Sequence, residues 1–325
     1  MGFISVVTPC YNEEENVKEL YLQVRGVFES LDESYVYEHI FIDNASKDGT
    51  VSILKEIAGK DKNVKIIVNV RNFGHIRSPY HAIFQARGDA VVCIAADLQD
   101  PPALIGDFIK KWKEGYKIVV GVKSKSEENP IMFAIRKLYY NLIEKFADTK
   151  QIKNFTGFGL YDKKFIDIIK NFNEPYPYFR GLIMEMGFEI AKVQFVQPKR
   201  KKGKTKNNFY TLFDIAMLGF VNHSKVPLRM ATFVGFSVAI ISLLIALSYF
   251  IYKLAFWQSF QVGVAPMVIG IFFFAAVQLF FIGIIGEYIG AIYTQVKNRP
   301  LVIEKERINF DLDASNTGKT EKCTN

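Results

Sequence analysis

Short apolar segments alternate with longer amphipathic ones over the first 125 residues of this 325-residue chain. In the longer segments, apolar residues recur at helical spacing, as Val17, Leu20 and Val24 do. The short segments are typical of buried strands, and they lie at Phe3–Val7, Glu38–Asp43, Val64–Val70, Ala90–Ala96 and Lys117–Gly121. Strands that alternate with helices predict an α/β fold with a Rossmann-like, mostly parallel, doubly wound sheet.

The same pattern continues after these strands. Ile131–Ala147 predicts an apolar helix, and Asn154–Asp162 predicts a tight turn that leads into a strand. A further helix opens at Tyr178-Phe179-Arg180-Gly181, and Glu189–Val196 predicts one more strand before Pro198. These elements extend the predicted α/β domain to about residue 206.

Two long apolar runs follow this domain. Ala231–Leu254 has 24 residues with no charge before Lys253, and Val264–Gly286 has 23 residues. As a helix, each run is long enough to cross about 30 Å of hydrocarbon. A pair of buried helices in a soluble protein is the alternative to the two transmembrane helices that we expect.

The charge distribution indicates a membrane rather than nucleic acid. The formal net charge of +8 suits nucleic acid, anionic lipid or a phosphorylated substrate. The basic run Lys199–Lys206 alone could be a solvated loop or a nucleic-acid patch. However, the apolar residues from Phe209 to Phe220 form an amphipathic pattern suited to a membrane interface. We therefore expect anionic membrane lipids as partners and no nucleic acid.

The basic residues also predict an orientation. Lys199–Arg229 and Lys297–Arg307 are rich in Lys and Arg, whereas the loop Ala255–Gly263 has neither. The positive-inside rule then places both termini and the α/β domain in the cytoplasm, in a multi-pass protein of the cytoplasmic (inner) membrane. We predict an α/β domain at 1–206, an interface-helix region at 207–229, a two-helix transmembrane domain at 230–296 and a cytoplasmic tail at 297–325.

Polar residues follow each of the first four predicted strands. The clearest case is Ala90–Pro102, where a strand leads into Asp97-Leu98-Gln99-Asp100 and ends at Pro101-Pro102. Ligands of open α/β sheets bind beyond the carboxyl ends of strands, and acidic oxygens are the ligands that a hard divalent cation prefers. An Asx-type turn before a Pro-started helix would explain the stretch equally well.

The other three strand ends strengthen the ligand interpretation. They carry Tyr11–Glu15, Asp43–Thr50 and Arg71–His75. Each could be a helix cap, but four polar ends on one edge of a sheet favour a binding site. The cysteines Cys10, Cys93 and Cys323 show no metal-like spacing, and the first two lie in apolar strand contexts typical of inert core thiols.

These motifs together resemble the family-2 inverting glycosyltransferases of the GT-A fold. The resemblance rests on Pro9-x-Tyr11-Asn12-Glu13, Asp43-x-x-Ser46-x-Asp48-Gly49-Thr50, Asn72-Phe73-Gly74 and Asp97–Pro102. It narrows to the polyprenyl-phosphate glycosyltransferases related to dolichyl-phosphate mannose synthase and the bactoprenol glucosyltransferases. That subgroup also carries Lys204-Thr205-Lys206, Pro227-Leu228-Arg229, Gly286-Glu287-Tyr288-Ile289-Gly290 and Lys297-Asn298-Arg299-Pro300.

The resemblance implies a role for each matching residue. The nucleotide of a UDP- or GDP-linked sugar would bind at Pro9, Tyr11, Glu13, Asp43, Asn72 and Gly74. Asp97 and Gln99 would face a Mg²⁺ or Mn²⁺ ion that bridges the donor diphosphate. The catalytic set would be Asp97 with three cations: Lys123 and Arg136 for the lipid phosphate, and Arg180 near the diphosphate or the acceptor. The implied function is sugar transfer to polyprenyl (undecaprenyl) phosphate for cell-envelope glycan modification, by a homo-oligomer.

Three positions depart from the family pattern. Ala95 stands where an Asp-x-Asp motif has its first acid, Gly157-Phe158-Gly159-Leu160 replaces an Asp-Phe-Arg-Leu segment, and Lys123 replaces an arginine. The departures keep open a membrane-anchored scaffold with a degenerate site. A glycosyltransferase that acts on hydroxyl groups is a third alternative, but the Gln-x-x-Arg-Trp signature of such polysaccharide synthases does not occur in this chain.

Overall fold

The computed structural model describes residues 2–31, 35–125, 152, 154–172, 174, 177–198, 226–256, 264–297 and 299–310. The predicted helix at 131–147 with Arg136, the basic run at 199–206 and the interface-helix region up to residue 225 lie outside these residues. The chain divides into two compact units. The first comprises Met1–Phe133, Gln151–Asn207 and Asn298–Asn325, and the second comprises Ala134–Lys150 and Asn208–Lys297.

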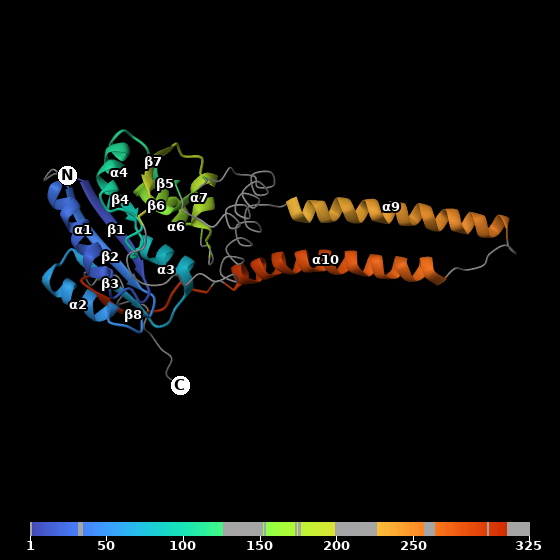
Figure 1. The fold of residues 1–325 in the computed structure, drawn as a ribbon, viewed down its shortest axis with the longest axis horizontal. Coiled ribbons are helices and arrows are strands. Elements are labelled where there is room, and N and C mark those ends of the chain that lie inside the picture. The colour runs from blue at the N-terminus through green and yellow to red at the C-terminus, as the bar shows by residue number, and fades with distance from the viewer. Residues whose placement is uncertain are drawn as a thin grey trace. The chain divides into compact units, whose positions relative to one another are not determined.

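The first unit is built on one eight-stranded sheet with the order β7-β5-β6-β4-β1-β2-β3-β8 (Figure 1). The strands are β1 (Gly2–Cys10), β2 (Tyr35–Asp43), β3 (Val64–Asn69), β4 (Ala90–Cys93), β5 (Ile118–Lys125), β6 (Phe155–Asp162), β7 (Ile190–Val196) and β8 (Glu304–Ile308). The helices are α1 (Val17–Ser30), α2 (Thr50–Lys60), α3 (Gly74–Ile83), α4 (Leu104–Lys113), α6 (Lys163–Lys170) and α7 (Phe179–Glu185). The predicted α/β class is confirmed.

Helices cover both faces of the sheet, as a doubly wound fold requires. Apolar residues of α1, α2 and α4, such as Leu20, Leu54 and Phe108, pack on one face. Residues of α3, α6 and α7, such as Tyr80 and Phe165, pack on the other. The central strands are buried on both sides, which explains their nearly continuous apolar sequences.

The sheet is more mixed than the sequence pattern predicted. The pairs β1–β2, β1–β4, β2–β3 and β5–β7 are parallel, whereas β4–β6, β5–β6 and β3–β8 are antiparallel. The predicted strand at 154–162 forms, but its direction depends on neighbours that are distant in sequence. Gly159 allows its close approach to β5, because a Cβ atom there would collide with the carbonyl oxygen of Val119.

A strand from the end of the chain completes the sheet edge. Residues 301–310, here called the β8 segment, belong to the predicted tail, yet β8 pairs with β3. Asn309 donates to the carbonyl oxygens of Ala58 and Val64 at 2.8 Å each. Lys55 forms an ion pair with Glu306 at 2.7 Å. The β8 segment is therefore part of the α/β unit, although it follows the apolar helices in sequence.

The β8 segment also contacts α3. Glu304 meets the His81 Nε2 atom at 2.5 Å and is hydrogen-bonded by Arg307. Although burial raises the pKa of Glu304, the hydrogen bonds from Arg307 and His81 outweigh it and lower that pKa to about 2. Arg307 also donates to Gln85 at 2.7 Å. These contacts connect the end of the chain to the helix that begins at Gly74.

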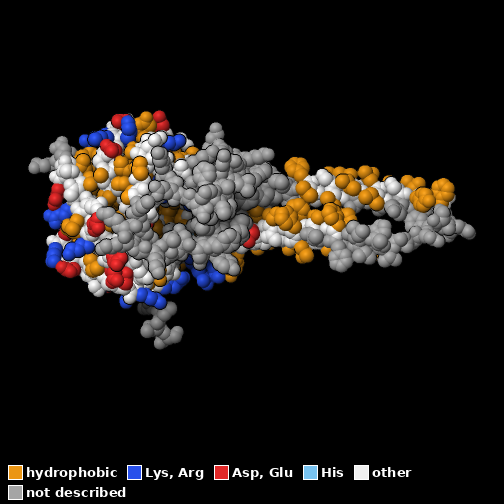
Figure 2. All heavy atoms as spheres, viewed as in Figure 1, with side chains coloured by type: hydrophobic (Ala, Val, Ile, Leu, Met, Phe, Trp, Pro, Cys, Tyr) orange, Lys and Arg blue, Asp and Glu red, His pale blue; other side chains and the backbone are white. Residues whose placement is uncertain are grey.

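The second unit contains two long apolar helices, α9 (Val226–Ala255) and α10 (Val264–Val296). Figure 2 shows apolar side chains exposed along them. By length and composition, one stretch among the described residues, Phe273–Val296, could cross a membrane, with a mean hydropathy of 1.8. The prediction of two transmembrane helices thus stays a prediction.

We predict that the α/β unit depends on the β8 segment. A chain that ends at residue 298 loses β8 and its contacts with β3 and α3, and its melting temperature should fall by about 10 °C or more. The matched control ends at residue 310 and keeps every contact described above. Thermal unfolding of the detergent-solubilised chains measures the difference, and equal melting temperatures for the two would contradict the prediction.

Candidate functional site

The loops that follow β1 and β2 hold each other through hydrogen bonds. The backbone N–H of Asn12 donates to the Ser46 hydroxyl at 2.8 Å, and the Lys47 N–H donates to Asn12 Oδ1 at 2.7 Å. The Glu13 N–H donates to the Thr50 hydroxyl at 2.8 Å. The polar residues of the first two motifs thus satisfy each other's backbone groups, which explains why both loops are polar.

Asp43 lies at the floor between these loops. It is fully buried, its Oδ2 atom accepts the Ser46 N–H at 2.9 Å, and its Oδ1 atom lies 4.0 Å from the Cys10 sulfur. Burial raises the pKa of Asp43, and the hydrogen bonds from Ser46 oppose that rise. Burial also raises the pKa of the Cys10 and Cys93 thiols. Both thiols are therefore protonated at neutral pH, and Cys10 is a core residue as expected, whereas Cys93 is only partly buried.

Three strand ends turn through the left-handed backbone region. Asn12, Ala45 and Leu98 have φ angles of 54°, 62° and 58°. Asn tolerates this region, but Ala and Leu adopt it at a cost. At Leu98 the turn buries the leucine side chain and leaves the flanking Asp97 and Gln99 partly exposed. The strained backbone of Leu98 therefore lies between two polar side chains that are partly exposed at the end of β4.

Asp100 lies beneath this turn. It is buried, and its Oδ2 atom accepts the Ala95 N–H at 3.4 Å. Burial, and after it the charge of Asp97, raises the pKa of Asp100 to about 6, while the charge of Lys123 opposes the rise. The structure thus brings Asp97, Asp100 and Lys123 into one electrostatic group at the carboxyl end of β4.

The donor set at this turn fits a cation only in part. Asp97 and Gln99 offer partly exposed oxygens from one turn, and Asp97 Oδ1 also accepts the Gln99 N–H at 3.2 Å. Among the described residues, no cluster of three or more His, Cys, Asp or Glu side chains could hold a metal ion. The two oxygens suit Mg²⁺ or Mn²⁺ if substrate phosphate and water complete the coordination, as is usual for Mg²⁺.

The predicted cations Lys123 and Arg180 are each bonded to the chain where it enters β6. Lys123 is on β5, and its backbone N–H donates to the Asn154 carbonyl oxygen at 3.2 Å. Arg180, in α7, donates from Nη1 to the carbonyl oxygen of Phe155, the residue that follows Asn154, at 3.2 Å. The Arg180 guanidinium also lies 5.5 Å from the centre of the Tyr178 ring. The third predicted cation, Arg136, is outside the described residues.

Asn72 and Gly74 belong to a loop held by a residue that sequence reasoning missed. Asn72 Oδ1 accepts from the Asn44 side chain at 2.9 Å and from the Gly74 N–H at 2.8 Å. Gly74 has a φ angle of 88°, where glycine is favoured. In sequence, Asn44 directly follows Asp43, a predicted nucleotide-binding residue. Its role becomes visible only in the structure, where its side chain is buried.

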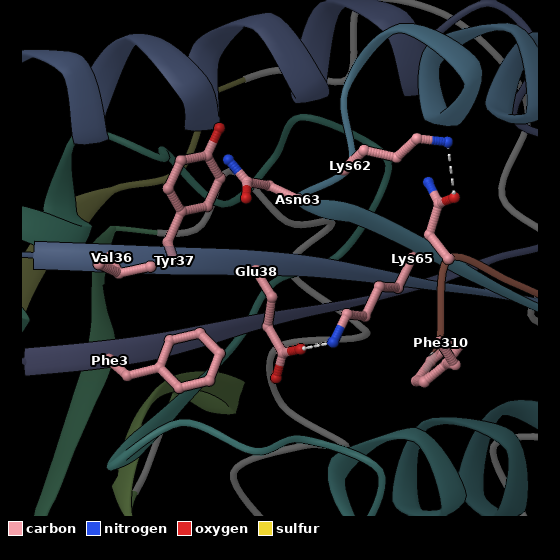
Figure 3. A pocket seen from close by; sticks show the side chains of 9 residues that line it. Phe3, Val36, Tyr37, Glu38, Lys62, Asn63, Lys65 and Phe310 are labelled. Carbon is pink, nitrogen blue, oxygen red and sulfur yellow. Dashed lines mark hydrogen bonds and ion pairs between the residues drawn. The ribbon is translucent and has the colours of Figure 1, made fainter. Parts of the chain in front are cut away.

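A separate pocket of about 440 Å³ lies at the opposite edge of the sheet, where β1, β2 and β3 begin (Figure 3). Glu38 and Lys65 point toward each other within it and form an ion pair at 2.6 Å. Glu38 also accepts the Arg87 N–H at 2.8 Å, just before β4. These contacts give the pair a structural role in holding the chain that enters β4. None of the predicted site residues lines this pocket.

The chain belongs to glycosyl transferase family 2, whose sequence model matches residues 5–167. The mixed sheet is of the GT-A type, as the resemblance implied. The prediction that the protein is a glycosyltransferase is confirmed.

Several relatives match nearly the whole chain. The uncharacterized glycosyltransferase YkcC of Bacillus subtilis is 35% identical over 94% of this chain and 94% of its own length. The SfII prophage-derived bactoprenol glucosyl transferase of Shigella flexneri is 35% identical over 93% of this chain and 97% of its own. Among solved structures, glucosyl-3-phosphoglycerate synthase of Mycobacterium tuberculosis, in complex with Mn²⁺, UDP and phosphoglyceric acid, has a TM-score of 0.48 at 16% identity. The structural match covers 68% of this chain and 76% of the synthase chain.

Ala45 provides a test of the strained loop geometry. Ala45→Gly should leave the free energy of unfolding within about 1 kcal/mol of the parent, because relief of the left-handed strain offsets the greater freedom of glycine in the unfolded chain. Ala45→Val should cost about 1–3 kcal/mol, because a β-branched residue is strongly disfavoured at this φ angle. Denaturant unfolding compares the two, and a valine variant as stable as the glycine variant would show that the loop adopts another conformation.

Proposed function

We propose that this glycosyltransferase transfers a sugar from a nucleotide donor to polyprenyl phosphate, such as undecaprenyl phosphate, at the cytoplasmic face of a membrane. The supporting observation is the likeness to a bactoprenol glucosyl transferase over 93% of this chain and 97% of that protein. A match of this extent spans the α/β unit and both apolar helices. The product would serve the modification of cell-envelope glycans.

In this proposal the donor nucleotide occupies the interlocked loops. Pro9, Tyr11, Glu13 and Asp43 line the nucleoside pocket, and the Asn72–Gly74 loop forms a further wall. The hydrogen bonds between the first two loops support this assignment, because they fix the backbone around the fully buried Asp43 before any ligand binds. A donor linked to UDP or GDP would suit the site.

The acceptor chemistry needs charge compensation more than it needs a base. A phosphate monoester has a second pKa of about 6, so its oxygen is already an anionic nucleophile at pH 7. The residues must align it with the anomeric carbon for an inverting displacement and balance two sets of phosphate charges. Lys123, Arg136 and Arg180 are proposed for that role, and Asp97 and Gln99 for holding Mg²⁺ or Mn²⁺. When bound, such an ion would neutralise charge on the diphosphate leaving group.

The membrane part of the proposal has α9 and α10 as two spans, with both chain termini in the cytoplasm. The exposed apolar side chains of both helices and the basic residues that flank them support it. Basic side chains near an anionic surface contribute about 1 kcal/mol each to membrane attachment. We also propose a homo-oligomer that packs through these spans. A protein attached in this way meets a soluble donor and a lipid acceptor at one surface.

The direct test uses membranes that contain the protein, radiolabelled nucleotide sugars and polyprenyl phosphate. We expect label in the lipid extract, in a product that mild acid cleaves, because a sugar phosphodiester of a polyprenol is acid-labile. An acid-stable product on a hydroxyl acceptor would favour the hydroxyl-directed alternative. Absence of lipid label with every donor, alongside an active control enzyme, would reject the proposal.

Asp97 and Ala95 give the sharper test of the proposed metal site. Asp97→Ala should lower transfer by about 100-fold or more, because loss of supporting metal contacts already costs 10- to 100-fold in other sites. Ala95→Asp should keep activity or lower the Mn²⁺ concentration needed for half-maximal rate. Asp107→Ala, which removes an exposed acid on α4, is the matched control and should leave the rate unchanged. Full activity of Asp97→Ala would remove Asp97 from the site.

A further inference from the structure

The side chain of Asn44 uses its full hydrogen-bonding capacity within the protein. Its Nδ2 group donates to Asn72 Oδ1 at 2.9 Å and to the Gly74 carbonyl oxygen at 3.0 Å. Its Oδ1 atom accepts from the Phe73 N–H at 2.9 Å and from the Asn69 amide at 3.2 Å. A side-chain amide has two N–H donors and two acceptor lone pairs, so each is used once.

This arrangement is buried and therefore specific for an amide. Asn44 is 7% exposed, and its partner Asn69 is 1% exposed, as is Ser78, the other acceptor of the Asn69 amide. Water has little access to replace a lost bond, and a buried polar group without a partner is costly. An aspartate has the same shape but lacks both donors, so it would face the Asn72 and Gly74 oxygens with a negative charge.

Asn44 also connects the two halves of the proposed nucleotide pocket. Its backbone N–H donates to the Cys10 carbonyl oxygen at 2.9 Å, and it directly follows Asp43 at the end of β2. The preceding side chain, Asp43, is held by Ser46, and Ser46 is bonded to Asn12. Two consecutive residues thus fix the loops that follow β1 and β2 and the loop between β3 and α3.

We propose that Asn44 is a positioning residue for the donor nucleotide, which holds the Asn72–Gly74 loop against the strand end that carries Asp43. This inference rests on the function proposed above. Asn44 touches no reacting atom in this proposal, because its four side-chain bonds all go to the protein. A preformed loop does not have to be ordered when the donor binds, so loss of Asn44 should weaken donor binding and leave acceptor binding unaffected.

The test compares two buried substitutions in the same hydrogen-bond network. Asn44→Asp should raise the KM for the nucleotide sugar by about 10- to 100-fold, the scale expected when a binding wall moves by about 1 Å, with the acceptor KM changed by less than about twofold. Ser78→Ala removes the other acceptor of the Asn69 amide without touching the Asn72–Gly74 loop, and it should leave both KM values within about twofold.

The two variants also separate positioning from general stability. An unchanged donor KM in Asn44→Asp would overturn the inference. An equal rise in Ser78→Ala would overturn it too, because the effect would then follow stability rather than loop position. Asn44→Ala, which removes all four side-chain bonds, is the second variant and should raise the donor KM at least as far as Asn44→Asp does.

A second measurement keeps this inference separate from the proposed function. Hydrogen exchange of the full-length protein reports on the Phe73 and Gly74 amides, which are bonded to Asn44 Oδ1 and Asn72 Oδ1. Both amides should exchange faster in Asn44→Ala than in the parent, whereas amides of β4 should not. If the parent binds no nucleotide sugar, the proposed function fails, but hydrogen exchange still tests whether Asn44 holds the loop. Equal protection of both amides in Asn44→Ala and in the parent would overturn the positioning role.

Discussion

Hydrogen bonds that cross between loops hold the candidate site together, because the loops beyond a parallel sheet have backbone groups that no strand can pair. In this protein the chain segments after β1 and β2 satisfy each other's backbone N–H groups through the side chains of Asn12, Ser46 and Thr50. The loop after β3 is satisfied by the Asn44 side chain. Removal of one side chain therefore leaves a hydrogen-bonding group of the neighbouring loop without that partner. The polar residues at the strand ends serve the fold and the proposed ligand site at once.

The edge of the sheet shows a second dependence, between distant parts of the chain. β8 comes after α10 in sequence, yet it pairs with β3 and contacts α2 and α3 through Glu306 and Glu304. A boundary drawn at residue 206 would therefore cut off a strand of the same sheet. It would also leave one side of β3 unpaired, as an exposed sheet edge of the kind that proteins normally cover or protect with charged residues. The charged residues of β8 provide that protection at the new edge.

Local sequence predicted the features that have a local cause. The strands before Asp43 and Asp97 were predicted because their apolar residues form short buried runs, and α1 was predicted because Val17 and Leu20 follow helical spacing. The direction of β6 and the pairing of β8 could not be predicted, because both depend on strands far away in sequence. Asn44 was missed for the same reason: its four partners become visible only when β2 and β3 lie side by side.

The acidic turn after β4 shows how one missing side chain changes the electrostatics around it. Ala95 leaves Asp97 as the one partly exposed acid of the turn, while Asp100 is buried and bonded to the Ala95 N–H. Asp100 already has its pKa raised by burial and by Asp97, with Lys123 in opposition. A carboxylate at position 95 would add an acid to this group, and it would repel Asp97 and Asp100, with Lys123 as the charge that opposes them. The alanine therefore lowers the electrostatic repulsion at the ligand-free turn.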